Sequence, residues 1–136
     1  MRRTPFALAV GVAVAALALT GCGGGDEEAT PTDTGTTTTP AVGSTLKGSV
    51  GPGFDISLST EDGQPVTTLA PGSYTLEVDD MASSHNFHLT GPGVDVMTEV
   101  SEEETESFEM ALQAGSYSFV CDPHAGSLNG SFEVSG

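Results

Sequence analysis

Short runs of alternating apolar and polar residues fill the chain after residue 44, and Gly, Pro and Asp separate them. A period of two places alternate side chains on one face, so each run predicts a strand with one buried face. No window keeps a helical period, although the acidic stretch 101–109 comes nearest to one. The expected strands are Thr45–Val50, Phe54–Ser59, Ser73–Asp79, His85–Leu89, Ser107–Leu112, Ser116–Cys121 and Gly130–Val134. Seven short strands at this spacing predict an all-β fold, a β-sandwich.

The N-terminal pattern is different. Arg2 and Arg3 precede an uncharged apolar run over residues 6–19, which is typical of a signal peptide and too short to span a bilayer stably. The run ends in Leu-Thr-Gly-Cys22, which resembles the lipobox of bacterial lipoproteins. We therefore expect a signal peptide at 1–21 and a lipid on Cys22 that holds the chain to a membrane outside the cytoplasm. An ordinary signal peptide followed by a chance cysteine is the alternative.

Residues 22–44 are mainly Gly, Thr, Pro and acidic residues. Such a segment has too little apolar content to offset the entropy cost of ordering, so it predicts a flexible linker. The linker would hold a single domain, residues 45–136, away from the membrane. Two segments of that domain, 69–74 and 112–117, both end in Gly-Ser-Tyr, and each leads into a strand and then a polar loop. An ancestral repeat and ordinary turn chemistry both explain this similarity.

The charge balance is strongly acidic. Residues 1–21 hold two of the three basic residues and none of the nineteen acidic ones, so the mature chain keeps one basic residue. This excludes general affinity for nucleic acid or anionic lipid and favours basic protein partners. An acidic run is either solvated surface or a docking patch for a basic redox partner, and it consists of Glu99, Glu102, Glu103, Glu104, Glu106 and Glu109.

The cysteine count carries the first chemical signal. If Cys22 is lipidated, Cys121 has no disulfide partner, and an odd cysteine in an oxidising compartment indicates a reactive thiol or a metal ligand. A Cys121-x-x-His124 turn with one distant histidine would supply the thiolate and two imidazoles that copper electron-transfer sites use. The simpler alternative is a small buried apolar residue at the end of a core strand.

The distant histidine must come from the segment 83–89, which contains His85 and His88. Strand alternation would place His85 on the apolar face and Asn86 with His88 on the other. His85 also starts its strand, where loop ligands gather. We therefore predict His85 as the ligand and His88 as a surface residue or one behind the ligands.

Together, these motifs are similar to those of the plastocyanin and azurin family of blue copper proteins, the cupredoxins. The matching features are His85-Asn86 before an apolar strand, Tyr-x-Phe-x-Cys ending at Cys121, and His124 in the last hairpin. The resemblance covers residues 45–136 and implies a Greek-key sandwich of about seven to eight strands. It also implies one copper ion, Cu(I) or Cu(II), on His85, Cys121 and His124, with Asn86 hydrogen-bonded to the cysteine loop.

One position departs from the family pattern. The family usually has a weak axial methionine a few residues after the second histidine, and Leu128 stands there instead. A leucine cannot donate to copper, so the resemblance implies a more nearly trigonal site, a preference for Cu(I) and a raised reduction potential. Met81, just before the His85 segment, is the nearest other methionine.

The expected function is a membrane-tethered, monomeric carrier of single electrons that serves redox partner proteins. A site with three protein ligands and no open position does not favour an enzyme. A copper-handling protein outside the cytoplasm is an alternative, although such proteins usually expose several further Met and His residues. A metal-free sandwich module is a second alternative, which a failure to bind copper would support.

Overall fold

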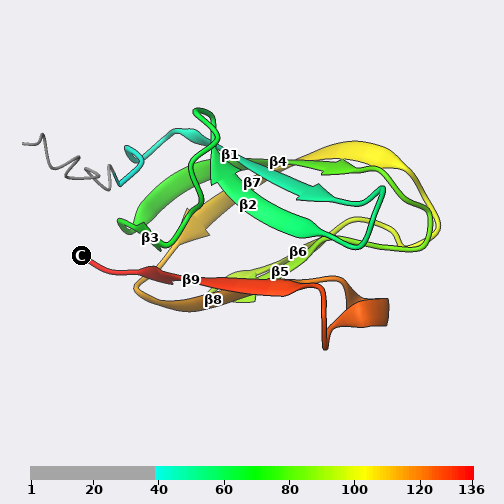
Figure 1. Ribbon diagram of the computed structural model, residues 1–136. Helices are drawn as coiled ribbons and strands as arrows, with labels where there is room; N and C mark the ends of the chain where they lie inside the picture. Colours follow the sequence, from blue (N-terminus) through cyan, green and yellow to red (C-terminus); the bar gives the residue numbers. More distant parts are fainter. Residues whose placement is uncertain (1–38) are drawn as a thin grey trace, which may run out of the picture. The chain divides into compact units, whose positions relative to one another are not determined.

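The computed structural model describes residues 39–136, which form a sandwich of two β-sheets, drawn as two stacked layers in Figure 1. The first sheet contains β1 (Thr45–Val50), β2 (Ile56–Thr60), β4 (Gly72–Asp80) and β7 (Glu104–Leu112), in the order β2-β1-β4-β7. The second sheet contains β3 (Thr68–Leu69), β5 (His88–Gly91), β6 (Val94–Met97), β8 (Gly115–Val120) and β9 (Asn129–Val134), in the order β3-β9-β8-β5-β6.

The chain crosses between the sheets after β2, β3, β4, β6 and β7, and β1 pairs in parallel with β4, while its other neighbour, β2, is antiparallel. These crossings are those of a Greek-key sandwich, so the all-β expectation is confirmed. The residues described contain one helical element, a 3-10 helix at Asp122–His124. In Figure 1 this helix, coloured orange, lies at the end of the sandwich opposite the C-terminus.

Three details of the predicted elements are wrong. The sandwich has nine strands instead of seven or eight, because β3 has two residues and β6 is a short edge strand. The stretch 101–109, the nearest approach to a helix, enters β7 at Glu104, and β7 pairs with β4 over nine residues. The strand expected from His85 begins at His88, because the N–H of Phe87 donates to the Thr98 hydroxyl instead of a neighbouring strand.

The core follows the predicted alternation. On β4 the buried apolar side chains are Tyr74, Leu76 and Val78, with polar or half-buried residues between them. Stacked aromatic pairs then fill the space between the sheets and loops. The ring centroids of Phe87 and Phe119 lie 5.6 Å apart. Because all of this apolar surface is buried between the layers, the loops at either end start from a rigid base.

The two similar segments both form turns at the end of the sandwich remote from the 3-10 helix. The hydroxyl of Tyr74 donates to the carbonyl oxygen of Ala70, 3.0 Å away. The hydroxyl of Tyr117 accepts from the N–H of Gln113 at 2.9 Å, so each tyrosine bonds back four residues. Each turn starts a strand, β4 or β8, which carries the chain to a histidine-bearing loop at the other end.

The expected signal peptide (1–21), the lipidation site Cys22 and most of the expected linker lie outside the described residues. The described chain enters the sandwich through a turn, where the N–H of Gly43 donates to the carbonyl oxygen of Ser73 at 2.7 Å. Among residues 39–136, no helix is long and apolar enough to cross a membrane.

Candidate metal centre

Three side chains from two loops converge at one end of the sandwich. His85 comes from the loop between β4 and β5, and Cys121 and His124 come from the loop between β8 and β9. The Nδ1 atoms of the two histidines lie 3.1 Å apart, and Cys121 Sγ lies 3.5 Å from each of them. The structure therefore brings together the three residues that the sequence pointed to.

This triangle of donor atoms fits a metal ion. A point within it lies about 2 Å from all three atoms, close to the length of a bond between imidazole and a first-row metal. Cys121 is fully buried, and it is a free thiol. Structural zinc sites usually close with four ligands, whereas one thiolate and two imidazoles in a trigonal set suit copper. Three such donors gather here among the residues that the structure describes.

The loop that carries Cys121 and His124 is closed by its own backbone. Cys121 N–H donates to the carbonyl oxygen of Leu128, and Leu128 N–H donates to that of His124, both at 2.9 Å. Pro123 lies in the first turn of the 3-10 helix between them, where its missing N–H costs no hydrogen bond. The side chain of Leu128 is buried in the core. Leu128, which stands where the family usually has its axial methionine, therefore packs as hydrocarbon and offers no donor atom.

A buried carboxylate anchors the loop that carries His85. Asp80, only 2% exposed, accepts from the hydroxyl of Thr98 at 2.6 Å and from Ala82 N–H at 3.3 Å. The same Thr98 hydroxyl oxygen accepts from Phe87 N–H at 2.9 Å, and His85 N–H donates to the carbonyl oxygen of Ala82. Burial raises the pKa of Asp80, and the hydrogen bond from Thr98 opposes that rise only in part.

Sequence reasoning missed Asp80 and Thr98. The alternation of β4 could have found Asp80, because it falls on the same face as Tyr74, Leu76 and Val78. A carboxylate at a core position of a strand is rarely left unpaired, so it indicates a local partner. Thr98 carried no comparable signal.

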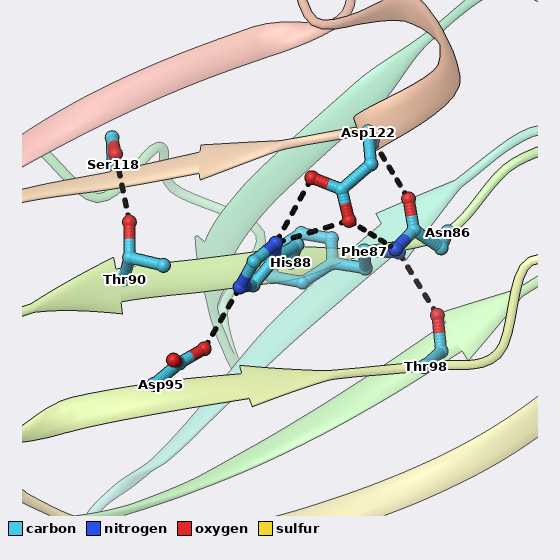
Figure 2. A network of polar contacts seen from close by, with 8 residues as sticks. All are labelled: Asn86, Phe87, His88, Thr90, Asp95, Thr98, Ser118 and Asp122. Atoms are coloured by element: carbon cyan, nitrogen blue, oxygen red, sulfur yellow. Dashed lines mark hydrogen bonds and ion pairs between the residues drawn. The ribbon is translucent and has the colours of Figure 1, made fainter.

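Asn86 joins the two loops. Its Oδ1 accepts from Asp122 N–H at 2.8 Å, and its Nδ2 donates to the carboxylate of Asp122 at 2.9 Å, as Figure 2 shows. The structure thus contains the hydrogen bond to the cysteine loop that the family resemblance implied. Asn86 is 1% exposed, however, and does not share an outer face with His88. The predicted alternation of side chains between two faces does not hold at Asn86, because Asn86 precedes β5.

Phe54 covers the two histidines and was not recognised from the sequence as part of the site. Its side chain is 63% exposed, and its ring stands edge-on to both imidazoles, with centroids 4.7 Å from His124 and 5.4 Å from His85. The expected strand from Phe54 begins instead at Ile56, which leaves Phe54 in the loop. An apolar ring at this place limits the access of water to the donor atoms.

Comparisons with known proteins identify the fold. No protein-family model and no curated protein matches the chain. A crystal structure of a rusticyanin mutant at 1.5 Å resolution is 20% identical, with a TM-score of 0.50, and the match covers 67% of this chain and 76% of that one. Rusticyanin from Thiobacillus ferrooxidans at 1.27 Å matches over the same shares, with 20% identity and a TM-score of 0.48.

A third structure, that of the copper protein rusticyanin at 2.1 Å resolution, is 19% identical over the same shares, with a TM-score of 0.48. At these identities the likeness to the 1.5 Å mutant structure establishes the fold alone. The domain therefore has a cupredoxin-like fold, as the motifs implied.

Proposed function

We propose that this domain binds one copper ion through His85 Nδ1, Cys121 Sγ and His124 Nδ1 and that it carries single electrons. The observation that carries the proposal is the triangle of these three atoms, with sides of 3.1, 3.5 and 3.5 Å, built from two loops that bond to each other. A copper ion supplies the one-electron chemistry by alternating between Cu(I) and Cu(II).

The contribution of the chain is to hold the donor atoms still. The Cys121 loop is closed through Leu128, and the His85 loop is tied to Asp80. Donor atoms that need not move when the charge of the site changes require little reorganisation, and this favours fast electron transfer. Leu128 adds no fourth donor, so we expect a preference for Cu(I) and a high reduction potential.

The wider setting follows from the sequence. We propose that a lipid on Cys22 tethers the domain to a membrane outside the cytoplasm, with residues 22–44 as the spacer. The described residues contain one basic side chain apart from histidine, Lys47, which already forms an ion pair with Glu77. Such an acidic surface supports a basic redox partner, which it would attract most strongly at low ionic strength. We propose that the domain acts as a monomer and not as an enzyme.

The test is a complete redox cycle with a count of bound copper. Protein loaded with one equivalent of Cu(II) is reduced with ascorbate beside a Cu(I) chelator, desalted and reoxidised with ferricyanide. An electron carrier should take up and return one electron per copper and keep its metal, while Cys121→Ser should not. Loss of the copper to the chelator on reduction would contradict the carrier and support a copper-handling protein.

A further inference from the structure

A histidine that is not one of the three donors lies between two carboxylates. His88, the first residue of β5, has its Nδ1 3.0 Å from both carboxylate oxygens of Asp122. Its Nε2 lies 2.8 Å from a carboxylate oxygen of Asp95 on β6. Figure 2 shows the imidazole bridging the two acids. This arrangement draws together three elements of the chain, namely β5, β6 and the loop after β8.

The geometry fixes the charge of the ring. An ionised carboxylate only accepts hydrogen bonds, and a neutral imidazole has a single N–H to donate. Two bonds from His88 to Asp95 and Asp122 therefore need both ring nitrogens protonated, which makes His88 an imidazolium. Burial lowers the pKa of His88, but the hydrogen bonds and charges of Asp122 and Asp95 outweigh it, so the pKa is raised.

The groups around the ring are few. Across the sheet, His88 lies beside Met97 on β6 and Val120 on β8, neither of which titrates. Among the described residues, the charged groups that face the imidazole are therefore Asp95 from β6 and Asp122 from the loop after β8. The His88 side chain is 18% exposed, so water screens these two ion pairs only in part.

The bridge connects to both ligand-bearing loops. Asp122 directly follows Cys121, and its carboxylate also accepts from Asn86, the residue after His85. We infer that His88 is a positioning residue: as an imidazolium between Asp95 and Asp122 it fixes Asp122, and through its proton it makes the reduction potential of the site depend on pH. The second half of this inference rests on the proposed function.

The sign of the effect follows from charge. Loss of the His88 proton leaves Asp122 without its cation, and the neutral ring can then donate to only one of its two carboxylates. More uncompensated negative charge beside Cys121 favours the higher oxidation state, so the reduction potential falls as the pH rises. Reciprocally, reduction of the site strengthens proton binding at His88. Near the pKa of His88, each electron taken from an external donor is therefore accompanied by part of one proton taken from water.

The first test needs no copper. Ring nitrogen chemical shifts of the metal-free mature chain, with Cys22→Ser to remove the acylated thiol, are followed by NMR between about pH 5 and about pH 9. We expect both nitrogens of His88 to be protonated at neutral pH, with loss of the proton at higher pH than in an Asp95→Asn variant. A neutral single tautomer at neutral pH would overturn the bridge.

The second test measures the reduction potential over the same pH range. The wild-type potential should fall through one inflection, which His88→Gln should abolish and Asp95→Asn should move to lower pH. The matched control is Asp62→Asn, which also removes one carboxylate, from an exposed turn, and should leave the inflection in place. If His88→Gln does not fold, the Asp95 and Asp62 variants still decide the question.

The two proposals fail in distinguishable ways. A protein that binds copper and cycles one electron, but whose potential is flat or keeps its inflection in His88→Gln, would overturn the inference and leave the proposed function intact. A protein that forms no copper–thiolate bond would overturn the proposed function, while the NMR titration would still decide whether His88 holds Asp122.

Discussion

The two loops that supply the donor atoms begin alike and are anchored differently. Each follows a strand that starts at a Gly-Ser-Tyr turn, β4 for the loop with His85 and β8 for the loop with Cys121. The first loop is held by the buried carboxylate of Asp80. The second is held by its own backbone and by Asp122, whose side chain is 45% exposed.

The two carboxylates respond to their surroundings in opposite directions. Burial raises the pKa of Asp80, and its hydrogen bonds do not compensate. Burial also acts to raise the pKa of Asp122, but hydrogen bonds from Asn86 and His88 outweigh it, so that pKa is lowered. The first loop therefore depends on a desolvated anchor that is costly to disturb. The second depends on an exposed charge pair that solvent and pH can adjust.

The largest expected effect is at the buried anchor. Asp80→Ala removes the acceptor of Thr98 and Ala82 and should lower the free energy of unfolding by about 3 kcal/mol. Asp79→Ala is the matched control, because this adjacent exposed carboxylate should matter by less than about 0.5 kcal/mol. Urea unfolding of the metal-free protein measures both, and equal effects would contradict the account of the first loop.

The bond between the loops comes next. Asn86→Ala leaves the N–H of Asp122 without its acceptor and should cost about 2 kcal/mol. Asn129→Ala, which removes an exposed bond to Ala125 within the second loop, should cost under about 1 kcal/mol. Urea midpoints of the two variants give the comparison. A larger loss for Asn129→Ala would mean that the loops are not coupled through Asn86.

The ion pair between His88 and Asp122 should contribute less to the free energy of unfolding, and its contribution should depend on pH. The pKa of His88 is raised from 6.5, so its stabilisation is complete below pH 6.5 and is lost as the pH rises through the folded-state pKa. The pKa of Asp122 is lowered from 3.8, so its stabilisation is complete above pH 3.8 and is lost as the pH falls through the folded-state pKa. Because Asp122 and Asp95 are well exposed, we expect less than about 1 kcal/mol on the alkaline side.

Urea unfolding at about pH 6 and about pH 9 measures this loss, with His88→Gln as the control that should not show it. A wild-type protein that is more stable at the higher pH would have the wrong sign for the charge pair. The raised pKa of Asp80 lowers stability as the pH rises from the ordinary value of 3.8 to the folded-state pKa. His88→Gln keeps Asp80, so this contribution is common to both proteins.

At Leu128 the main expected effect is on the reduction potential and not on stability. Leu128→Met is a nearly volume-conserving change in the core and should cost less than about 1.5 kcal/mol. A thioether there should nevertheless lower the reduction potential, because a fourth donor stabilises Cu(II). Potentiometry of the copper-loaded variant measures this. A potential that rises or does not move would contradict the expected role of Leu128.

The sequence alone pointed to the three residues that cluster in the structure, because much of their pattern is local. Cys121 and His124 stand three apart in one turn, and the alternation in β4 and β8 placed both loops at the end of core strands. Prediction from the sequence failed where a side-chain hydrogen bond takes the place of a backbone hydrogen bond between strands. Phe87 N–H bonds to the Thr98 hydroxyl, so the strand expected from His85 starts three residues later, and the burial of Asn86 could not be seen.

Contacts between distant segments were also out of reach. The ring of Phe54 stands over two histidines that follow it by 31 and 70 residues, and no periodic pattern connects them. The His88 bridge depends on the register of three elements, which β-strand propensity does not determine. Only the folded sandwich shows that Asp95 and Asp122 meet at one imidazole.

The central claim is that Cys121 binds copper together with the two histidines. The most direct measurement is the visible absorption spectrum after addition of Cu(II) to the mature chain with Cys22→Ser, beside the same protein carrying Cys121→Ser. The account predicts an intense blue band at one copper per chain that is absent from the Cys121→Ser protein. A colourless protein, or copper bound equally well without Cys121, would contradict it.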